Sequence, residues 1–600
     1  MGHGSSRKAR RRRARQGRLL LHPSYPPRLH HGYATPIPTN RARPPSKQCH
    51  LPLAPIAPPL SYEAIRSLAA SVGYPHQSIL CQMFNALQYR DHFLSLFPSP
   101  FPKSPGVPSR LHPDRLHEAL AFDLIQEVSH HSPIYTSHSC FPVPKSDGLH
   151  SRFITNVTFN DQHLLPSEGG VEWSCPLPSF PQLIRRILGW SWAHEVDAQS
   201  FFPQFKLGKD IRPFFGIRQR GFRGVLTRMP QGWSKAPSIA QHTASAVTYN
   251  CSAPQDPSSG AFPWIDNLIS GGTSLEAATS VLQTVLSRCA DCHITLKAHE
   301  PCPSQELHVV GLHFDLKTSQ YRLDQAWATS SSSFLLDYIH EASRGCPPPL
   351  RVTWTAIGIA LWTSHVSLLP LGTHMWDTIM FMKRHTPRVQ VSTAWDEKCT
   401  VHEDVIVELR SCQRRLAANP WLPKPPPLIT LHQCKNLLIT DASLWAGSFL
   451  CSLVDCPTIT KVNGMWWQWT GRATGQWMPI LEALALLRAL QELQSRNCLP
   501  SDIVWLTDCE PVRKAFLRQY SPSAKLNGIL RSIRQFPVNI VPCWIPSELN
   551  SADPFSRRTD FAPLQSLDGI ALPDPALHAF ISSPAYTGEA PRTSLKRKRG

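Results

Sequence analysis

Residues 192–205 read WAHEVDAQSFFPQF, and residues 262–269 read FPWIDNLI. In the first stretch, an apolar strand is expected to end at Asp197, with the aromatic Phe202 five residues further on. In the second stretch, Asp266 lies between two short apolar runs, as it would at the tip of a β-hairpin. Either stretch alone also fits an ordinary turn. Together they predict two acids, distant in sequence, that meet on adjacent strands.

Two such acids are what nucleotidyl transfer requires. Carboxylate oxygens hold two divalent metal ions about 4 Å apart, one activating a primer hydroxyl and one neutralising a triphosphate. We therefore expect Asp197 and Asp266 to be metal ligands and catalytic residues. The expected cofactor is Mg²⁺ or Mn²⁺, with two ions in the site.

Further segments lie on either side of these acids. They read FPVPKSDGLHSRFITNVTFN (141–160), MPQGWSKAP (229–237), HITLK (293–297) and VVGLHF (309–314). In order along the chain, all of these segments resemble the motifs of reverse transcriptases. In that family a Lys and an Arg of the fingers clasp the incoming triphosphate, an aromatic side chain excludes a ribose 2′-hydroxyl, and a Leu-Pro-Gln-Gly motif lines the nucleotide pocket. The resemblance implies nucleotide-binding roles for Lys145, Arg152, Phe202, Gln231, Gly232 and Lys297. The alternative is that the cations are ordinary surface charges and Gln231–Gly232 a plain turn.

The signature itself departs from the family pattern. Trp264 and Asn267 stand where the family's Tyr-x-Asp-Asp motif has its Tyr and its second Asp, and Met229 replaces the more usual Leu. An Asn oxygen can ligate a metal but carries no charge, so Asp197 and Asp266 would supply most of the metal binding beside Asn267. The departure leaves an alternative open, in which the chain keeps this fold as an RNA-binding scaffold without catalysis.

A second set of acids follows in residues 436–558. The segments read NLLITDASLWAGSF (436–449), PILEALALLRAL (479–490), IVWLTD (503–508) and WIPSELNSADPFSRR (544–558). Two are apolar strands that carry or end in Asp441 and Asp508, and one is a helix with Glu482 near its start. Taken singly, Glu482 fits a favourable charge near a helix N-terminus and Asp508 fits a helix cap.

The ordered set resembles the RNase H domain of retroelements. It implies that Asp441, Glu482, Asp508 and Asp553 hold two metal ions that activate water against an RNA strand. Asn550, Asp553, Ser556 and Arg557 match the family's last segment. This ending is the reason for a narrower resemblance to DIRS-like and VIPER-like retroelements, which integrate through a tyrosine recombinase. Long-terminal-repeat elements and pararetroviruses remain competitors, and a chain with only the nuclease active is a further alternative.

These segments predict an α+β chain of two main parts. We expect a right-hand polymerase (fingers, palm, thumb) followed by an α/β RNase H-like domain, with disordered basic tails. The expected divisions are a basic arm (1–60), a helical lead-in (61–115), fingers and palm (116–320), thumb, connection and Pro-rich linker (321–430), an RNase H-like domain (431–562) and a tail (563–600). Apolar periodicity also predicts a helix over residues 115–128.

The charge suits a polyanionic partner. The formal charge of the chain is +19. Twelve Lys or Arg lie in residues 1–62 and four more in Lys596–Arg599, so most of the excess is in the tails. The expected partners are an RNA template, a DNA primer, the RNA–DNA hybrid and dNTPs, bound largely through phosphates.

The cysteines and the apolar runs indicate the compartment. Seventeen Cys without a regular framework favour reduced thiols and an intracellular protein, cytoplasmic or nuclear, and no apolar run is long enough to span a bilayer. Cys289, Cys292 and His293 form a CxxCH pattern, but without an export signal we interpret them as thiols rather than as a haem attachment site.

Overall fold

The computed structural model describes most of the chain from residue 51 onward. It covers residues 51–101, 109, 111–145, 148–157, 160–161, 164, 175, 177–178, 180–298, 302–367, 375, 378–379, 397–425, 436–453, 463–469, 478–518, 521, 523–557 and 576–577. The described residues form two compact units. We call residues 51–325 with 420–425 the N-terminal unit, and residues 326–419 with 436–577 the C-terminal unit. Both mix helices and strands, while the expected tails lie largely outside the described residues.

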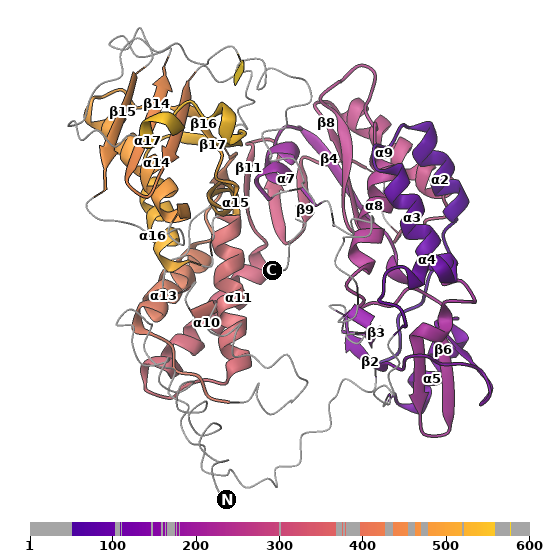
Figure 1. Ribbon diagram of the computed structural model, residues 1–600. Coiled ribbons are helices and arrows are strands. Elements are labelled where there is room, and N and C mark those ends of the chain that lie inside the picture. Colours follow the sequence, from indigo (N-terminus) through magenta and orange to yellow (C-terminus); the bar gives the residue numbers. More distant parts are fainter. Residues whose placement is uncertain are drawn as a thin grey trace, which may run out of the picture. The chain divides into compact units, whose positions relative to one another are not determined.

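The N-terminal unit is built on a three-stranded antiparallel sheet. Its strands are β4 (Trp192–Asp197), β7 (Gly260–Trp264) and β8 (Asn267–Gly272), in the order β4-β8-β7. Helices α8 (Ala236–Thr248) and α9 (Leu275–Asp291) pack against this sheet, and α2 (Tyr62–Ser71) and α3 (Gln77–Gln88) pack on α8 (Figure 1). The apolar faces of these elements form one continuous core. Burial of that core holds the ends of β4 and β8 in place.

Two smaller sheets flank this core. One has the order β1-β6-β5, and the other is the β2–β3 hairpin. The remaining elements of this region are α4 (Arg90–Leu94), α5 (Pro113–Ala121), β1 (Ile125–Glu127), β2 (Ser139–Pro144), β3 (Ser151–Asn156), α7 (Phe180–Ile187), η3 (Phe202–Gln204), η4 (Arg212–Phe215), β5 (Gly216–Gln219) and β6 (Phe222–Leu226).

The expectation of one helix over residues 115–128 is wrong in its second half. Helix α5 ends at Ala121, and residues Ile125–Glu127 form strand β1. Asp123 adopts a left-handed backbone conformation (φ 51°), which stops the helix. The following residues then pair with β6, where Ile125 lies opposite Leu226. Cross-strand pairing supplied by a distant segment overrides the local apolar spacing.

A four-stranded antiparallel sheet completes this unit. Its order is β12-β11-β10-β9, formed by β9 (Glu306–Val309), β10 (Leu312–Asp315), β11 (Gln320–Leu323) and β12 (Leu422–Pro423). Strand β12 belongs to the Pro-rich segment expected to be a linker. Part of that segment is therefore paired, with Pro423 opposite Gln320. A proline is tolerated there because β12 is an edge strand.

Among the described residues, the C-terminal unit begins with three long helices, which precede a five-stranded mixed sheet in the sequence. The helices are α10 (Gln325–Ser343), α11 (Leu350–Val366) and α13 (Glu403–Ala418). The sheet has the order β15-β14-β13-β16-β17, with β13, β16 and β17 parallel to one another and β14 and β15 antiparallel to their neighbours. Its strands are β13 (Leu437–Ala442), β14 (Ala446–Ser452), β15 (Asn463–Gln468), β16 (Asp502–Thr507) and β17 (Asn539–Trp544).

Helices cover both faces of the five-stranded sheet. They are α14 (Met478–Ser495), α15 (Glu510–Arg518), α16 (Ala524–Ile533), η7 (Ser547–Leu549) and α17 (Asp553–Ser556). One apolar cluster fills the side of α14 and α16, and a second, with Ile439, Leu506 and Ala552, fills the other side. Strands β13, β14 and β16 are buried on both faces along almost their whole length, as expected for the centre of such a sheet.

In the parts of the chain that the structure describes, no helix combines the length and the apolar character needed to cross a membrane.

Candidate active sites

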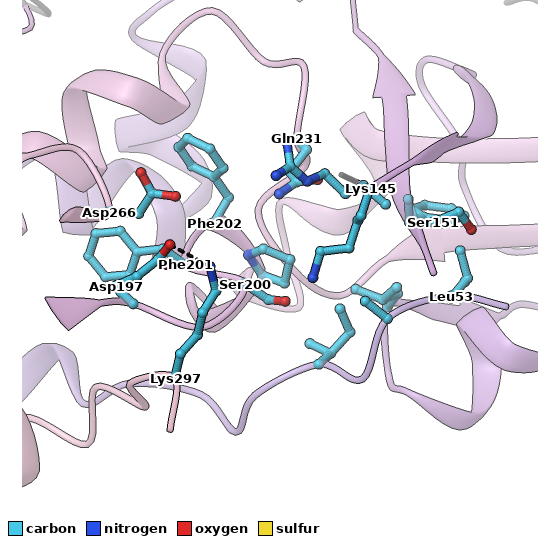
Figure 2. Close-up of a pocket in the computed structure, with 17 residues that line it drawn as sticks. Leu53, Lys145, Ser151, Asp197, Ser200, Phe201, Phe202, Gln231, Asp266 and Lys297 are labelled. Carbon is cyan, nitrogen blue, oxygen red and sulfur yellow. Dashed lines mark hydrogen bonds and ion pairs between the residues drawn. The ribbon is translucent and has the colours of Figure 1, made fainter. Parts of the chain in front are cut away.

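The first candidate site lies where β4 ends beside the β7–β8 turn. Asp197 is the last residue of β4 and pairs with Asn267, the first residue of β8. Asp266 occupies the turn, and its carbonyl accepts a 2.8 Å hydrogen bond from the backbone N–H of Ala198. Both Asp side chains line one cleft, where Figure 2 shows them together at one end. The structure thus brings together two acids that are 69 residues apart in sequence.

The turn that carries Asp266 is held in an unusual conformation. Its other residue, Ile265, has a positive φ of 57°, which is costly for a β-branched side chain. Gln241 of α8 stabilises this geometry, because its Oε1 accepts from the Ile265 N–H at 2.7 Å and its Nε2 donates to the Pro263 carbonyl at 3.2 Å. Sequence reasoning missed Gln241, and no local pattern identifies a buried glutamine that clamps a turn from another element.

The two acids interact with each other and with a cation. Burial raises the pKa of Asp266, and the neighbouring carboxylate of Asp197 raises it further. The ammonium group of Lys297 forms an ion pair with the Asp197 carboxylate, and the Lys297 N–H donates to the Asp197 carbonyl at 2.9 Å. The two carboxylates therefore concentrate negative charge, and the ammonium group of Lys297 compensates part of it. A divalent cation fits such a pair of oxygen donors.

A third carboxylate lies beside this pair. Glu195 precedes Asp197 by two residues on β4, so both side chains lie on the same face of the strand. The Asn267 amide donates a hydrogen bond to the Glu195 carboxylate. Burial, with Asp197 the next largest cause, raises the pKa of Glu195 to about 7. Sequence reasoning missed Glu195, although the two-residue period of a strand could have identified it.

The β2–β3 hairpin and the loop before α8 supply the other wall of the cleft. Lys145 follows β2, Arg152 lies on β3, and both line the cleft together with Gln231. Figure 2 shows Lys145 and Gln231 in this wall. The Thr155 N–H donates to the Gln231 carbonyl at 2.9 Å, which ties this loop to β3. A Cβ atom at residue 232 would lie 2.4 Å from the Thr155 carbonyl oxygen, so only Gly232 permits the approach.

Most of the expected nucleotide-site residues meet in this cleft. Seven of them line it, whereas Asn267 and Gly232 do not. Phe202, at the start of η3, lies between the acids and the Gln231 loop in Figure 2. The lining residues from the expected set are Lys145, Arg152, Asp197, Phe202, Gln231, Asp266 and Lys297.

The second candidate site lies at the carboxyl ends of two parallel strands. Asp441 is on β13 and Asp508 directly follows β16, which is the parallel neighbour of β13. Glu482 reaches them from the first turns of α14. Donor oxygens of these three acids all lie within 4.8 Å of one another, a spacing that suits a shared cation.

These acids are buried at a high electrostatic cost. Burial raises the pKa of Asp441 to about 7. The hydrogen bond from the Ser556 hydroxyl lowers this pKa, whereas the charges of Asp508 and Asp553 raise it further. Burial and the neighbouring Asp441 raise the pKa of Glu482 well above its usual value. Within the described residues, Glu482 Oε2 is buried without a hydrogen-bond partner. An oxygen left in this state fits a metal ligand, because a bound cation would compensate its charge.

Asn550 and Ser556 orient the acids of the second site. The Asn550 amide donates to Asp441 at 2.8 Å and to Asp508 at 3.3 Å, and the Ser556 hydroxyl donates to the other oxygen of Asp441. Asp553 is the first residue of α17 and is paired instead with Arg557, at 2.6 Å. The structure thus gathers three of the four expected acids into one ligand group and places Asp553 beside it.

The cysteines of the CxxCH pattern are buried thiols. Cys289 and Cys292 lie at the end of α9, each inside the core of the N-terminal unit. Burial raises the pKa of both thiols to about 12. Among the described residues all fourteen cysteines are free. Buried, protonated thiols of this kind act as small apolar side chains.

Comparisons with known proteins give only weak similarities. No protein-family model and no curated protein matches the chain. Among solved structures, a foamy viral protease–reverse transcriptase in complex with dsDNA has a TM-score of 0.40 and 12% identity, covering 83% of this chain and 99% of that one. The same kind of protein in complex with an RNA/DNA hybrid has a TM-score of 0.39 and 12% identity, covering 79% of this chain and 63% of that one. Similarities at this level assign no function to the chain.

Proposed function

We propose that the chain is an RNA-directed DNA polymerase with a second, RNase H-type active site. One observation carries the polymerase proposal: Asp197 and Asp266 lie at one end of a cleft whose other wall presents Lys145, Arg152 and Gln231. Paired carboxylates facing paired cations across a pocket suit a triphosphate and its metal ions. The proposed partners are an RNA template, a DNA primer, their hybrid and dNTPs.

Each side chain of the cleft has a definite part in this proposal. Mg²⁺ bound by Asp197 and Asp266 would activate the primer hydroxyl and neutralise charge on the triphosphate. Lys145 and Arg152 bind the phosphates as fixed cations, and Gln231 contacts the sugar and base. Lys297, now paired with Asp197, stabilises the carboxylates while no nucleotide is bound.

Glu195 supplies the charge that Asn267 lacks. It lies on the same strand face as Asp197 and already contacts the Asn267 side chain. Two carboxylates, Asp197 and Asp266, line the cleft, and Glu195 is close enough to both for their charges to raise its pKa. Asn267 acts as a positioning residue, because its amide holds the Glu195 carboxylate toward the two aspartates.

This arrangement predicts a loss and a rescue. Glu195→Gln keeps an acceptor for Asn267 but removes the charge, so primer extension should fall on the order of 10- to 100-fold. Adding Asn267→Asp to that variant should restore most of the activity, because it returns a carboxylate to the same place. Extension is measured with saturating dNTPs over a Mg²⁺ titration. Wild-type rates in Glu195→Gln, or no rescue by the second substitution, would contradict the role of Glu195.

Phe202 is expected to exclude ribonucleotides. Its ring lines the cleft beyond Asp197, where it would contact a 2′-hydroxyl. Phe202→Ala should raise incorporation of rNTPs relative to dNTPs by about 10- to 100-fold, the range for steric discrimination in a pocket. The ratio is measured in one variant with both substrates, so a general loss of activity does not affect it. An unchanged ratio would show that another group makes the selection.

The second site supports hydrolysis of the RNA strand. Asp441, Glu482 and Asp508 form a compact oxygen cage, and Asn550 and Ser556 hold Asp441 in place. Mg²⁺ in that cage would generate the attacking hydroxide. The residues Asn550, Asp553, Ser556 and Arg557 also support the narrower proposal of a DIRS-like or VIPER-like retroelement enzyme.

Primer extension on an RNA template tests the proposal directly. The full-length chain is incubated with an RNA template, a DNA primer, dNTPs and Mg²⁺ or Mn²⁺, and product length is measured on a gel. Extension supports the polymerase. The scaffold alternative, favoured by Asn267, predicts hybrid binding with neither extension nor cleavage. Cleavage of a labelled hybrid without primer extension would indicate that only the nuclease site is active.

A further inference from the structure

A second kind of metal site lies outside both carboxylate clusters, on the β9–β10 hairpin. The two strands are joined by a tight turn in which Val310 and Gly311 both have positive φ. The register places His308 directly opposite His313, so both rings lie on the same face of the sheet. Glu306 precedes His308 by two residues and shares that face. The opposite face is apolar and buried, through Leu307, Val309, Leu312 and Phe314.

The three side chains converge. One donor atom from each of Glu306, His308 and His313 lies within 4.8 Å of the others. The two rings are stacked with centroids 4.0 Å apart, and the Glu306 Oε2 atom is 3.6 Å from His313 Nε2. Around a tetrahedral ion with bonds of about 2.0–2.1 Å, ligands lie about 3.4 Å apart. Small side-chain rotations of the exposed Glu306 and His308 reach that spacing.

An independent observation points to a ligand. The side chain of His313 is 12% exposed, and its buried Nε2 atom makes no hydrogen bond within 3.5 Å among the described residues, since the Glu306 carboxylate at 3.6 Å lies just beyond that distance. A buried ring nitrogen without a partner calls for a bound ion or water.

We propose that Glu306, His308 and His313 bind a divalent transition-metal ion of the zinc class. Two imidazoles and one carboxylate favour Zn²⁺ over Mg²⁺, which prefers oxygen ligands alone. The Asp324 carboxylate lies 4.0 Å from His308 Nδ1 and can orient that ring so that Nε2 faces the ion. The ion would crosslink β9 and β10 and fix the hairpin. Binding of this ion does not depend on the proposed polymerase or nuclease activity, although His313 belongs to the VVGLHF segment (309–314).

Arg322 opposes a cation at this place. Its Nη2 atom lies 3.5 Å from His313 Nδ1, and its guanidinium group stacks over the Trp421 ring at 4.3 Å. Since like charges repel, Arg322→Gln should tighten Zn²⁺ binding severalfold. Tighter Zn²⁺ binding in Arg322→Gln is expected only if the metal ion binds at Glu306, His308 and His313. It is not expected if these three side chains interact only with one another through hydrogen bonds.

The test is a zinc titration of the full-length chain. Binding is measured by calorimetry in reducing buffer. Excess Mg²⁺ is present to occupy the carboxylate sites. His308→Asn should bind one zinc fewer per chain than the wild type, and Glu306→Gln should bind that zinc on the order of tenfold more weakly. The matched control is His340→Gln, at an exposed histidine of α10, which should keep the wild-type stoichiometry.

Stability supplies a second measurement. Because a ligand that binds only the folded state stabilises it, zinc should raise the melting temperature of the wild type and of His340→Gln more than that of His308→Asn. His308 is exposed, so its substitution should leave the fold intact. Equal zinc stoichiometry in the wild type, His308→Asn and the His308→Asn, His313→Asn double variant would overturn the proposal. A wild type that binds no zinc would overturn it too.

Discussion

Asp197→Asn should abolish primer extension while leaving hybrid cleavage intact. The substitution preserves the size of the side chain but removes a charge from the pair that would hold the metal ions. Losing about 4 kcal/mol of transition-state stabilisation corresponds to a decrease on the order of 10³-fold. Extension is measured under single-turnover conditions with Mg²⁺. Cleavage of a labelled RNA–DNA hybrid by the same preparation reports on the intact C-terminal unit.

Asp210→Asn is the matched control for this prediction. Asp210 is exposed and lies thirteen residues beyond Asp197, outside the residues that line the cleft. It should extend primers at the wild-type rate, because a charge in open solvent contributes little. Equal rates in the wild type and Asp197→Asn would remove the basis for the polymerase proposal. Loss of both activities in Asp197→Asn would instead indicate a folding defect, which circular dichroism detects.

Glu482→Gln should abolish hybrid cleavage and also stabilise the metal-free protein. Glu482 is 5% exposed, and one of its oxygens lacks a hydrogen-bond partner among the described residues. Removing this proposed metal ligand should lower cleavage on the order of 10³-fold, with primer extension unchanged. In EDTA, a neutral side chain avoids burying a charge beside Asp441 and Asp508, so the free energy of unfolding should rise by about 2 kcal/mol.

The stabilisation should depend on pH in a direction set by the raised pKa values. In the folded state the pKa of Asp441 is about 7. Between about pH 4 and 7 the folded protein therefore keeps the Asp441 proton, whereas the unfolded chain loses it. Metal-free wild-type protein therefore becomes less stable as pH rises through this window. The gain from Glu482→Gln should be small at pH 4 and larger at pH 8, because at the higher pH the wild type must either bury the charge or hold a proton that the unfolded chain releases.

Glu492→Gln is the control on the same helix. Glu492 forms a surface pair with Arg496, so its loss should change neither cleavage nor stability by more than a few tenths of a kcal/mol. Thermal unfolding is measured in EDTA and in Mg²⁺ at both pH values. If Glu482→Gln destabilises the metal-free protein at pH 8, the burial of Glu482 beside Asp441 and Asp508 is not costly, and the prediction is wrong.

The local elements follow from the order of residues. The apolar run that ends at Asp197, the hairpin that carries Asp266 and the helix that begins before Glu482 are all present in the structure. Each depends on a periodicity of two or 3.6 residues and on turn residues within a short window. These are local interactions, so the sequence alone predicts them. The helix expected over residues 115–128 failed in its second half, where a partner strand about 100 residues away decided the outcome.

The contacts that would make the sites work were decided by the tertiary structure. The Asn267–Glu195 hydrogen bond, the Gln241 clamp on the Ile265 turn and the Asn550 bridge between Asp441 and Asp508 join residues 24 to 109 positions apart. The Glu306–His308–His313 cluster likewise depends on strand register. No local pattern encodes such contacts, because they form only when burial of the apolar cores brings separate elements together. The sequence thus determined which acids and strands exist, and packing of the cores determined which polar side chains share a site.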